Sequence, residues 1–301
     1  MTTWAGEKTG LRIEAADGFG LAATLHERRG NGRDAVVLAG ATGVKRGFYG
    51  TVAASLASRG LDVLAFDYRG IGGSRPERLR GFGATMREWG ELDLDAALGW
   101  TLREREPDRL LVLGHSVGGQ LLGHASRADE VAAAFLVGSQ SGSWRHWPAP
   151  GRLGIFALWH LLIPSLSRPL GHFPSPWFGL GADLPSGVAR QWAHWGRHPD
   201  YLLRDGPEVR ERYARLHLPI LAASIAKDPF APEPAVRALL DLYPNAQRRL
   251  LRVGPVGHFD WFRPGNEALW AQAADWLDDP GLPLGEPLPR GAGRTLQASP
   301  A

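Results

Sequence analysis

The sequence contains no cysteine among its 301 residues. This absence excludes a disulfide framework, a cysteine-ligated zinc or iron–sulfur site, and a thiol nucleophile. Long runs of like charge are also missing, and 34 Lys and Arg residues nearly balance 31 Asp and Glu residues. Since a nucleic-acid-binding protein usually carries a basic cluster, we expect no nucleic-acid partner.

Lysine is scarce, and none of the three lysines, Lys8, Lys45 and Lys227, follows a glycine. The Gly-Lys pair of a phosphate-binding loop is therefore absent, although residues 40–43 read Gly-Ala-Thr-Gly. A nucleotidase that uses this loop is excluded.

Long hydrophobic runs are missing as well. Residues 1–11 lack the apolar segment of a signal peptide, so we expect no export and a cytoplasmic location. The most apolar stretch, residues 153–166, is interrupted by His160 and Pro164 and is shorter than the roughly 20 residues that span a bilayer. The sequence therefore predicts no transmembrane segment.

What is present is an alternation of short apolar runs with stretches of helical periodicity, which is typical of strands joined by crossover helices. We therefore predict an α/β fold with a mostly parallel sheet. An antiparallel pair is expected to precede it, around the Asp17-Gly18 turn. The predicted strands cover residues 11–16, 21–26, 35–39, 63–66, 110–113, 131–137, 220–224 and 249–253. The predicted helices cover residues 49–58, 89–103, 117–126, 234–242 and 266–276.

The alternation stops in residues 141–217, which hold six of the twelve tryptophans and six of the ten histidines. We interpret this segment as a cap inserted into a core formed by residues 1–140 and 218–278. Residues 279–301 are rich in Pro, Gly and Arg and have almost no apolar periodicity. Such a segment buries too little apolar area to offset its ordering entropy, so it is predicted to be a flexible tail.

A candidate nucleophile lies between a predicted strand and a predicted helix. Residues 114–118 read Gly-His-Ser-Val-Gly, which places Ser116 at a tight turn flanked by glycines. In this G-x-S-x-G arrangement the glycines let strand and helix approach closely, and the serine hydroxyl is exposed. Because both neighbouring elements are predicted, the motif is more than a chance match in a chain with 39 glycines.

A serine nucleophile needs a histidine base that is held by a carboxylate, and the chain order for this motif is Ser, acid, His. After His217 the only histidine is His258, which follows the last predicted strand. Asp228 begins a loop after the strand at residues 220–224 and is the candidate acid. Asp260 is a weaker choice because a residue so near His258 rarely reaches the far ring nitrogen.

The oxyanion of an attacked carbonyl needs backbone N–H donors from the residue after the nucleophile and from the loop after the third strand. These are predicted to be Val117 and Ala41, with the Thr42 hydroxyl as an additional donor. A second strand-end loop, residues 67–74, is interpreted as structural, with Arg69 paired to a carboxylate.

With these motifs in order, residues 8–278 resemble the α/β-hydrolase superfamily. Residues 67–74 and 228–232 are also similar to loops of that family. More narrowly, the chain resembles poorly characterised bacterial hydrolases near the serine-aminopeptidase and lysophospholipase-like branch. That narrower resemblance depends on Ala-Thr-Gly-Val at 41–44, Trp-Gly-Glu at 89–91 and Ser-Gln-Ser-Gly-Ser-Trp at 139–144.

The chain departs from the family at one point, where Ala39-Gly40 replaces the usual His-Gly, and this affects the shape of the oxyanion loop. The resemblance implies hydrolysis of an acyl group of a small molecule, without a metal or an organic cofactor. It does not imply a particular substrate or oligomeric state.

We therefore expect a serine hydrolase that cleaves an ester or a related acyl bond of a partly apolar substrate. The alternatives are a thioesterase or peptidase variant, or an idle hydrolase fold that binds a hydrophobic ligand. A third possibility is a lipid-surface role for residues 153–166. His194 and His198 are four residues apart, but no third metal ligand is evident, so no metal site is predicted. The candidate substrate-binding residues are the cap tryptophans Trp144, Trp147, Trp159, Trp192 and Trp195.

Overall fold

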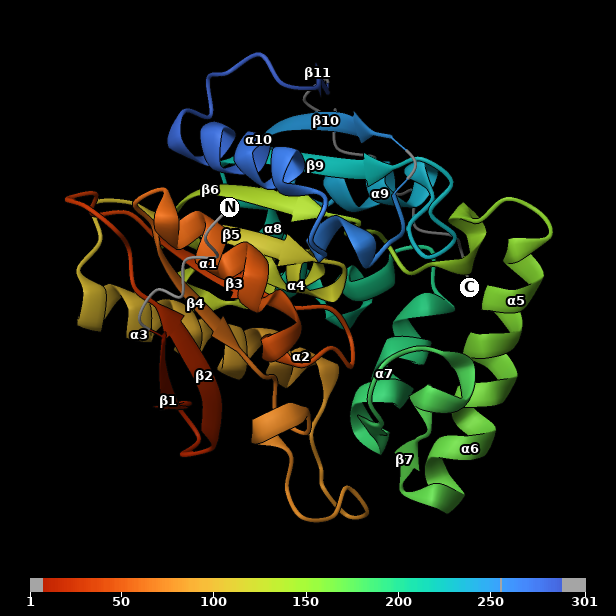
Figure 1. Ribbon diagram of the computed structural model, residues 1–301. Coiled ribbons are helices and arrows are strands. Elements are labelled where there is room, and N and C mark those ends of the chain that lie inside the picture. Colours follow the sequence, from red (N-terminus) through yellow and green to blue (C-terminus); the bar gives the residue numbers. More distant parts are fainter. Residues whose placement is uncertain (1–7, 255, 289–301) are drawn as a thin grey trace.

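One nine-stranded sheet organises the chain (Figure 1). The computed structural model describes residues 8–254 and 256–288. The strand order is β1-β2-β4-β3-β5-β6-β9-β10-β11. The strands are β1 (Lys8–Glu14), β2 (Gly20–His26), β3 (Ala35–Ala39), β4 (Asp62–Phe66), β5 (Leu110–His115), β6 (Val131–Val137), β9 (Pro219–Ile225), β10 (Gln247–Val253) and β11 (Glu286–Pro287).

The sheet is mostly parallel, and the predicted α/β class is confirmed. Strands β3, β4, β5, β6, β9 and β10 are parallel, whereas β2 runs antiparallel to β1 and β4, and β11 runs antiparallel to β10. Each of the eight predicted strands is present with boundaries that differ by a few residues at most. The apolar runs were long enough, and the turns between them clear enough, to locate these strands.

Helices cover both faces of the sheet because the buried strands are apolar on both sides. On β3, Val36 and Leu38 pack with helices α1 (Gly50–Ser58) and α10 (Glu267–Asp278). Val37 and Ala39 belong to the other apolar cluster. That cluster includes residues of α3 (Asp95–Arg105), α4 (Val117–Gln120), α8 (Pro207–Ala214) and α9 (Glu233–Leu240).

The helix predicted for residues 117–126 is wrong in length. The α-helix α4 ends at Gln120, and short 3₁₀ turns continue the chain. Two tyrosine hydroxyls donate to carbonyl oxygens here, Tyr213 to Gln120 and Tyr243 to Gly119. The ring of Tyr213 also lies against Gly123. These distant side chains occupy the place and the carbonyl oxygens that further helical turns would use.

The segment between β6 and β9 carries the helices α5 (Gly151–Ala157), α6 (Ile163–Leu170) and α7 (Ser186–Gly196) and the short hairpin β7 (His172–Phe173) and β8 (Leu184–Pro185). Figure 1 shows these elements beyond the arrowheads of β6 and β9, on the carboxyl side of the sheet. Helix α8, which also lies between β6 and β9, packs against the Leu122–His124 turn through Tyr213.

Helices α5 and α6 form one continuous helix, because a π-helical turn, Leu158–Leu162, joins them. The helix therefore runs through His160 and Pro164, the two residues that interrupt the apolar stretch in the sequence. Pro164 follows directly after the π-helical turn, where the regular hydrogen-bond ladder of the helix is already interrupted. The continuous helix Gly151–Leu170 has 20 residues and is the one helix of the described residues that is long and apolar enough to cross a membrane.

The predicted flexible tail also needs correction for its first part. Residues 279–288 follow α10 along the sheet edge, and β11 pairs with Arg249 and Leu250 of β10. Leu282, Leu284 and Leu288 pack against the two apolar clusters. The apolar side chains in this segment have no regular spacing, so periodicity did not reveal them. Residues 289–301 lie outside the described residues.

Because the ring of His124 is buried, we predict that the folded protein loses stability at acidic pH. Its Nδ1 lies 2.9 Å from the Tyr213 hydroxyl, and burial lowers the pKa of His124 to about 3, from an ordinary value of 6.5. The ring is therefore neutral in the folded protein, whereas unfolding lets it bind a proton below about pH 6.5. Its contribution to stability is complete above that pH and decreases as the pH falls toward 3.

Between pH 7 and pH 5 this residue should lower the free energy of unfolding by about 2 kcal/mol. Urea unfolding of the wild type and of His124→Phe at both pH values measures the effect. The variant should lose about 2 kcal/mol less on acidification, and equal losses in the two proteins would contradict a buried neutral ring.

Candidate active site

The candidate nucleophile occupies a strained turn between β5 and α4. Ser116 has φ 51° and ψ −114°, a backbone conformation that L-residues rarely adopt. A Cβ atom on Gly118 would collide with the Ala39 carbonyl, so only glycine allows α4 to approach β3 this closely. Strained residues of this kind concentrate at functional sites. The sequence motif and the backbone geometry thus single out the same residue.

His258 and Asp228 are in direct contact. The Nδ1 atom of His258 lies 2.6 Å from Oδ2 of Asp228, and both side chains are almost fully buried. The other carboxylate oxygen, Oδ1, accepts hydrogen bonds from the backbone N–H groups of Phe230 and Ala231. The carboxylate is thus fixed on both sides, and the far nitrogen of the imidazole, Nε2, remains for proton transfer.

Asp260 is not the carboxylate that contacts Nδ1 of His258. Its carboxylate instead forms an ion pair with Arg263, with an N–O distance of 3.2 Å, and both side chains are exposed. The lack of a side chain on Gly138 lets the His258 ring lie close to the end of β6. A Cβ atom at position 138 would be only 2.9 Å from that ring.

One cavity brings Ser116 and His258 together. It is about 110 Å³ in volume and also contains Ala41 and Thr42 in its lining. Ser116 and His258 are both more than nine-tenths buried. The nearly buried serine and histidine therefore border the same small cavity.

The two predicted oxyanion donors differ in the structure. The backbone N–H of Val117 has no hydrogen-bond acceptor in the part of the chain that the structure describes. The N–H of Ala41, by contrast, donates to the Tyr49 hydroxyl at 2.7 Å. The prediction that Ala41 supplies a free donor is therefore wrong for this structure, because a tyrosine eight residues later takes its hydrogen bond.

Thr42 offers a replacement donor. Its hydroxyl is buried, lies without a hydrogen-bond partner among the described residues, and belongs to a residue that lines the same cavity as Ser116. A buried hydroxyl without a partner is costly unless a ligand satisfies it. Thr42 thus gives the cavity one polar hydrogen, and Val117, next to Ser116 in the chain, carries another; neither is used by an atom of the described residues.

A buried hydrogen-bond chain connects three loops of the site. The Tyr49 hydroxyl accepts from Ala41 and lies 2.9 Å from Nδ1 of His115, while Nε2 of His115 lies 3.2 Å from the carbonyl oxygen of His258. Burial, with the nearby His258 ring, holds the pKa of His115 well below its ordinary value. The neutral ring thus accepts from Tyr49 and donates to the His258 carbonyl, which fixes the loop that carries His258.

The cavity walls are apolar and partly formed by tryptophans. Trp147, Trp159 and Trp192 line it, and each indole N–H donates to an oxygen elsewhere, on Pro229, Gly142 and Tyr201 respectively. The carbon surfaces of the three rings are thus left for a ligand. This is the part of the predicted tryptophan set that the structure places at the cavity.

Trp144 and Trp195 do not line the cavity. Trp195 is fully buried and donates its indole N–H to Asp205. Trp144 packs against Phe156, and the guanidinium of Arg145 covers its ring. Composition alone identified an aromatic segment but could not distinguish its wall residues from its core.

Several cavity residues had no signal in the sequence. Phe230 and Phe259 lie beside the acid and the base in sequence, so proximity to those residues could have suggested them. The others come from the helix Gly151–Leu170 and from loops whose orientation depends on tertiary packing. They are Gln140, Gly142, Ile155, Leu158 and Leu180.

The remaining candidate residues have other contacts. Arg69 forms a buried ion pair with Asp93 and a second ion pair with the exposed Asp17, so its expected pairing to a carboxylate is confirmed. His194 accepts a hydrogen bond from Arg204, and Nδ1 of His198 accepts one from the backbone of Asp200. One ring nitrogen of each histidine therefore already accepts a hydrogen bond from the protein.

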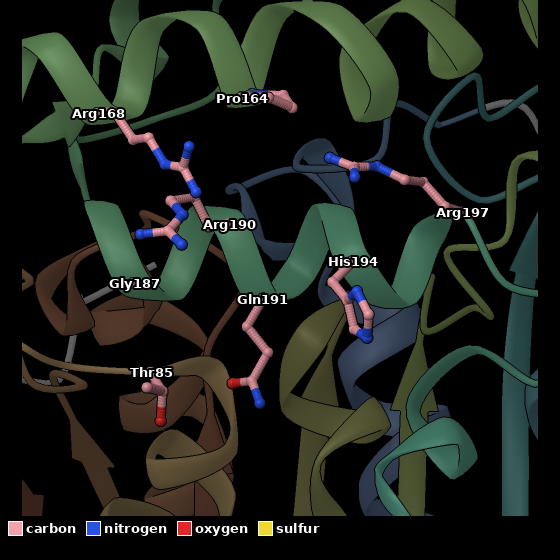
Figure 2. Close-up of a pocket in the computed structure, with 8 residues that line it drawn as sticks. All are labelled: Thr85, Pro164, Arg168, Gly187, Arg190, Gln191, His194 and Arg197. Carbon is pink, nitrogen blue, oxygen red and sulfur yellow. The ribbon is translucent and has the colours of Figure 1, made fainter.

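A larger cavity of about 640 Å³ lies between α6 and α7 and contains none of the candidate catalytic residues (Figure 2). Its lining is polar and basic, and includes Arg168, Arg190 and Arg197. Its volume alone gives it no role in acyl chemistry, which needs a nucleophile and a base.

Comparisons with known proteins show the family and the fold of this chain. A family model described as serine aminopeptidase, S33, matches residues 30–253. The structure of DcsB in complex with its substrate analogue has a TM-score of 0.64 at 15% sequence identity, over 90% of this chain and 98% of that one. No curated protein matches the sequence.

Two esterase structures are similar to the same extent. An esterase of Pyrococcus furiosus has a TM-score of 0.60 at 16% identity, over 91% of this chain and 93% of its own. The esterase EaEST of Exiguobacterium antarcticum has a TM-score of 0.61 at 19% identity, over 90% and 100%. At these identities the similarity shows the α/β-hydrolase fold.

Proposed function

Because this chain belongs to the serine aminopeptidase (S33) family of α/β hydrolases, we propose that it is a serine hydrolase that cleaves small carboxylic esters through an acyl-enzyme. The single observation that carries the proposal is the contact of His258 with Asp228 in the loops that enclose Ser116. A serine at a strained turn, a histidine in the same cavity and a buried carboxylate behind it form the arrangement that activates a hydroxyl.

The reaction follows from the positions of these groups. Oγ of Ser116 attacks the acyl carbonyl while Nε2 of His258 takes the hydroxyl proton. The negative oxygen that forms accepts hydrogen bonds from the Val117 N–H and the Thr42 hydroxyl. The intermediate then expels the alcohol, which receives the proton from His258. Water repeats the sequence on the acyl-enzyme and releases the carboxylic acid, and Asp228 stabilises the imidazolium in both halves.

The shape of the cavity supports a short acyl group. A volume of about 110 Å³ is well below the 300 to 1,000 Å³ of a site for a drug-sized ligand. It holds roughly four groups of the size of water. The walls are carbon surfaces of Trp147, Trp159 and Trp192, so burial of an acyl chain provides the binding free energy.

We predict an optimum acyl length of about two to four carbons, because each added methylene gains burial until the cavity is full. Hydrolysis of a p-nitrophenyl ester series by the wild type and by Trp192→Ala measures this. The variant removes one wall and should shift the maximum of kcat/KM to longer chains. Trp177→Ala is the matched control, since Trp177 is 70% exposed and does not line the cavity.

The same assay distinguishes the ester proposal from its closest alternatives. Thioesters of the same acyl groups and aminoacyl p-nitroanilides test thioesterase and aminopeptidase activity. Higher kcat/KM on either panel than on esters would overturn the ester assignment. A length profile that is flat in all three proteins would show that these tryptophans do not form the acyl site.

Thr42→Val should lower kcat by about 10- to 100-fold and leave KM nearly unchanged, because the hydroxyl is used only when the oxyanion forms. Valine keeps the side-chain volume and removes the donor. Thr42→Ser restores the hydroxyl and is expected to restore most of the rate. If valine and serine variants have equal rates, the hydroxyl takes no part in the reaction.

A further inference from the structure

The exposed large hydrophobic side chains are concentrated in one part of the chain. Among the described residues, those with substantial exposure are Leu153 (72%), Phe156 (38%), Leu161 (60%), Trp177 (70%) and Phe178 (37%). All five lie in a stretch of 26 residues, on the continuous helix Gly151–Leu170 and on the turn that follows the strand β7. Scattered exposed apolar residues are ordinary, but a concentration of them marks a binding surface.

The helix that carries three of these side chains has one inward and one outward side. Its inward side chains Ile155, Leu158 and Trp159 line the active-site cavity. Its outward side holds Leu153 and Leu161, and the most apolar part of the helix is only 17% buried. A helix this apolar in the core of a protein would be mostly buried, so its outer side has no partner among residues 8–254 and 256–288.

The charged side chains of the segment that carries this surface have one sign. No Asp or Glu occurs between Glu130 and Asp183. Arg152 is exposed in the first turn of the helix. Arg168 follows Leu161 by seven residues, about two helical turns, and therefore lies near the same side.

A second arginine reaches the same place from the neighbouring helix. Figure 2 shows Arg168 on α6 and Arg190 on α7 at the same end of the cavity between these helices. Both side chains are exposed, and neither forms an ion pair within the described part of the chain. Two unpaired guanidinium groups at one opening are suited to phosphate oxygens.

We propose that this surface docks on an anionic lipid bilayer. The outward apolar side chains enter the boundary between headgroups and acyl chains, and Arg152, Arg168 and Arg190 contact the lipid phosphates. Aromatic side chains such as Trp177 are favoured at that depth. The inference goes beyond the proposed hydrolase activity and uses none of its catalytic residues.

The helix lies on the bilayer rather than across it, because its inward side is fixed to the protein. Trp159 donates its indole N–H to the Gly142 carbonyl, and Arg197 donates to the carbonyl of Trp159. A second copy of the chain is a poorer occupant. Two such surfaces face to face would bring the arginines of one copy close to those of the other.

Docking would also bring the active-site cavity close to the lipid. The two exposed segments contribute Ile155, Leu158 and Leu180 to the wall of that cavity. The residues that contact lipid and the residues that contact substrate are thus neighbours on the same helix and the same turn.

Co-sedimentation of the full chain with vesicles tests the proposal. Phosphatidylcholine vesicles with about 30% phosphatidylglycerol should bind the protein, pure phosphatidylcholine should bind it more weakly, and high salt should reduce the difference. The double variant Leu153→Ser/Leu161→Ser should lower partitioning at least about tenfold. Its hydrolysis of a soluble ester and its melting temperature should match the wild type, since neither leucine lines the cavity.

Matched charge variants separate phosphate contact from general electrostatics. Arg168→Gln/Arg190→Gln should weaken binding to the anionic vesicles by about fivefold per charge, and Arg103→Gln on α3 should have little effect. Lipids brominated in the acyl chain should quench tryptophan fluorescence in the wild type and much less in Trp177→Phe.

Two outcomes would overturn the inference. One is an absence of vesicle binding, whether or not the free protein proves to be a dimer by light scattering. The other is equal binding by the wild type and the double leucine variant. Because the Ser116→Ala variant should bind vesicles as the wild type does, failure of the hydrolase proposal would leave this result unaffected.

Discussion

Replacement of Ser116 by alanine is expected to lower kcat/KM for a p-nitrophenyl ester by about 10³- to 10⁶-fold. The nucleophile, base and acid act as a unit, so removal of the attacking oxygen leaves only binding and oxyanion stabilisation. The melting temperature should remain close to that of the wild type, because alanine fills the same space and Ser116 Oγ supports no structural hydrogen bond among the described residues.

Ser141→Ala is the control for this experiment. Ser141 is also buried in the loop after β6, but it does not line the active-site cavity. Its replacement should leave the ester rate nearly unchanged. Comparable losses in the two variants would mean that general disturbance of the site, and not loss of a nucleophile, explains the effect.

Asp228→Asn should lower kcat by about 10²- to 10⁴-fold, whereas Asp260→Asn should have a much smaller effect. The carboxylate of Asp228 accepts from Nδ1 of His258 and thereby keeps Nε2 free to take the serine proton. An amide in its place can donate to Nδ1 and favours the wrong tautomer. Asp260 is exposed and pairs with Arg263, so it has no comparable influence on the imidazole.

The comparison of the two asparagine variants is informative because the residues lie on opposite sides of His258 in sequence. Rates measured across a range of pH separate loss of the base from loss of fold. If Asp260→Asn were the more damaging change, the acid assignment would have to be exchanged, and with it the geometry of the proposed reaction.

The fold was predictable because its strands are short apolar runs bounded by clear turns. The nucleophile turn was predictable for a related reason, since Gly114 and Gly118 are required by close approaches that any such turn must make. His258 and Asp228 were identified by their order in the chain and by the absence of competing residues. These features depend on local sequence and on connectivity.

The predictions for the length of α4 and for the C-terminal segment were wrong because both depend on contacts between residues distant in sequence. Helix α4 is shortened by the hydroxyls of Tyr213 and Tyr243, which come from the far part of the chain. The start of the C-terminal segment is ordered by pairing with Leu250 of β10. Neither contact leaves a periodic signal in the segment that it changes.

In the oxyanion loop, one hydrogen bond changes which residue is assigned as the oxyanion donor. Ala41 occupies the position that the family pattern predicts, but its N–H donates to Tyr49. The partner is only eight residues away, yet its hydroxyl reaches Ala41 only because the following helix packs on the sheet. Thr42 then becomes the better candidate because its hydroxyl is buried without a partner in the described structure.

The central claim is that Ser116 is a nucleophile activated by His258, and labelling with a fluorophosphonate probe followed by peptide mass spectrometry tests it most directly. The probe reacts with an activated serine and leaves a covalent phosphonyl adduct. The adduct is predicted at Ser116 in the wild type, at a much reduced rate in His258→Ala, and not at all in Ser116→Ala. An adduct on another residue, or equal labelling of the wild type and Ser116→Ala, would contradict the claim.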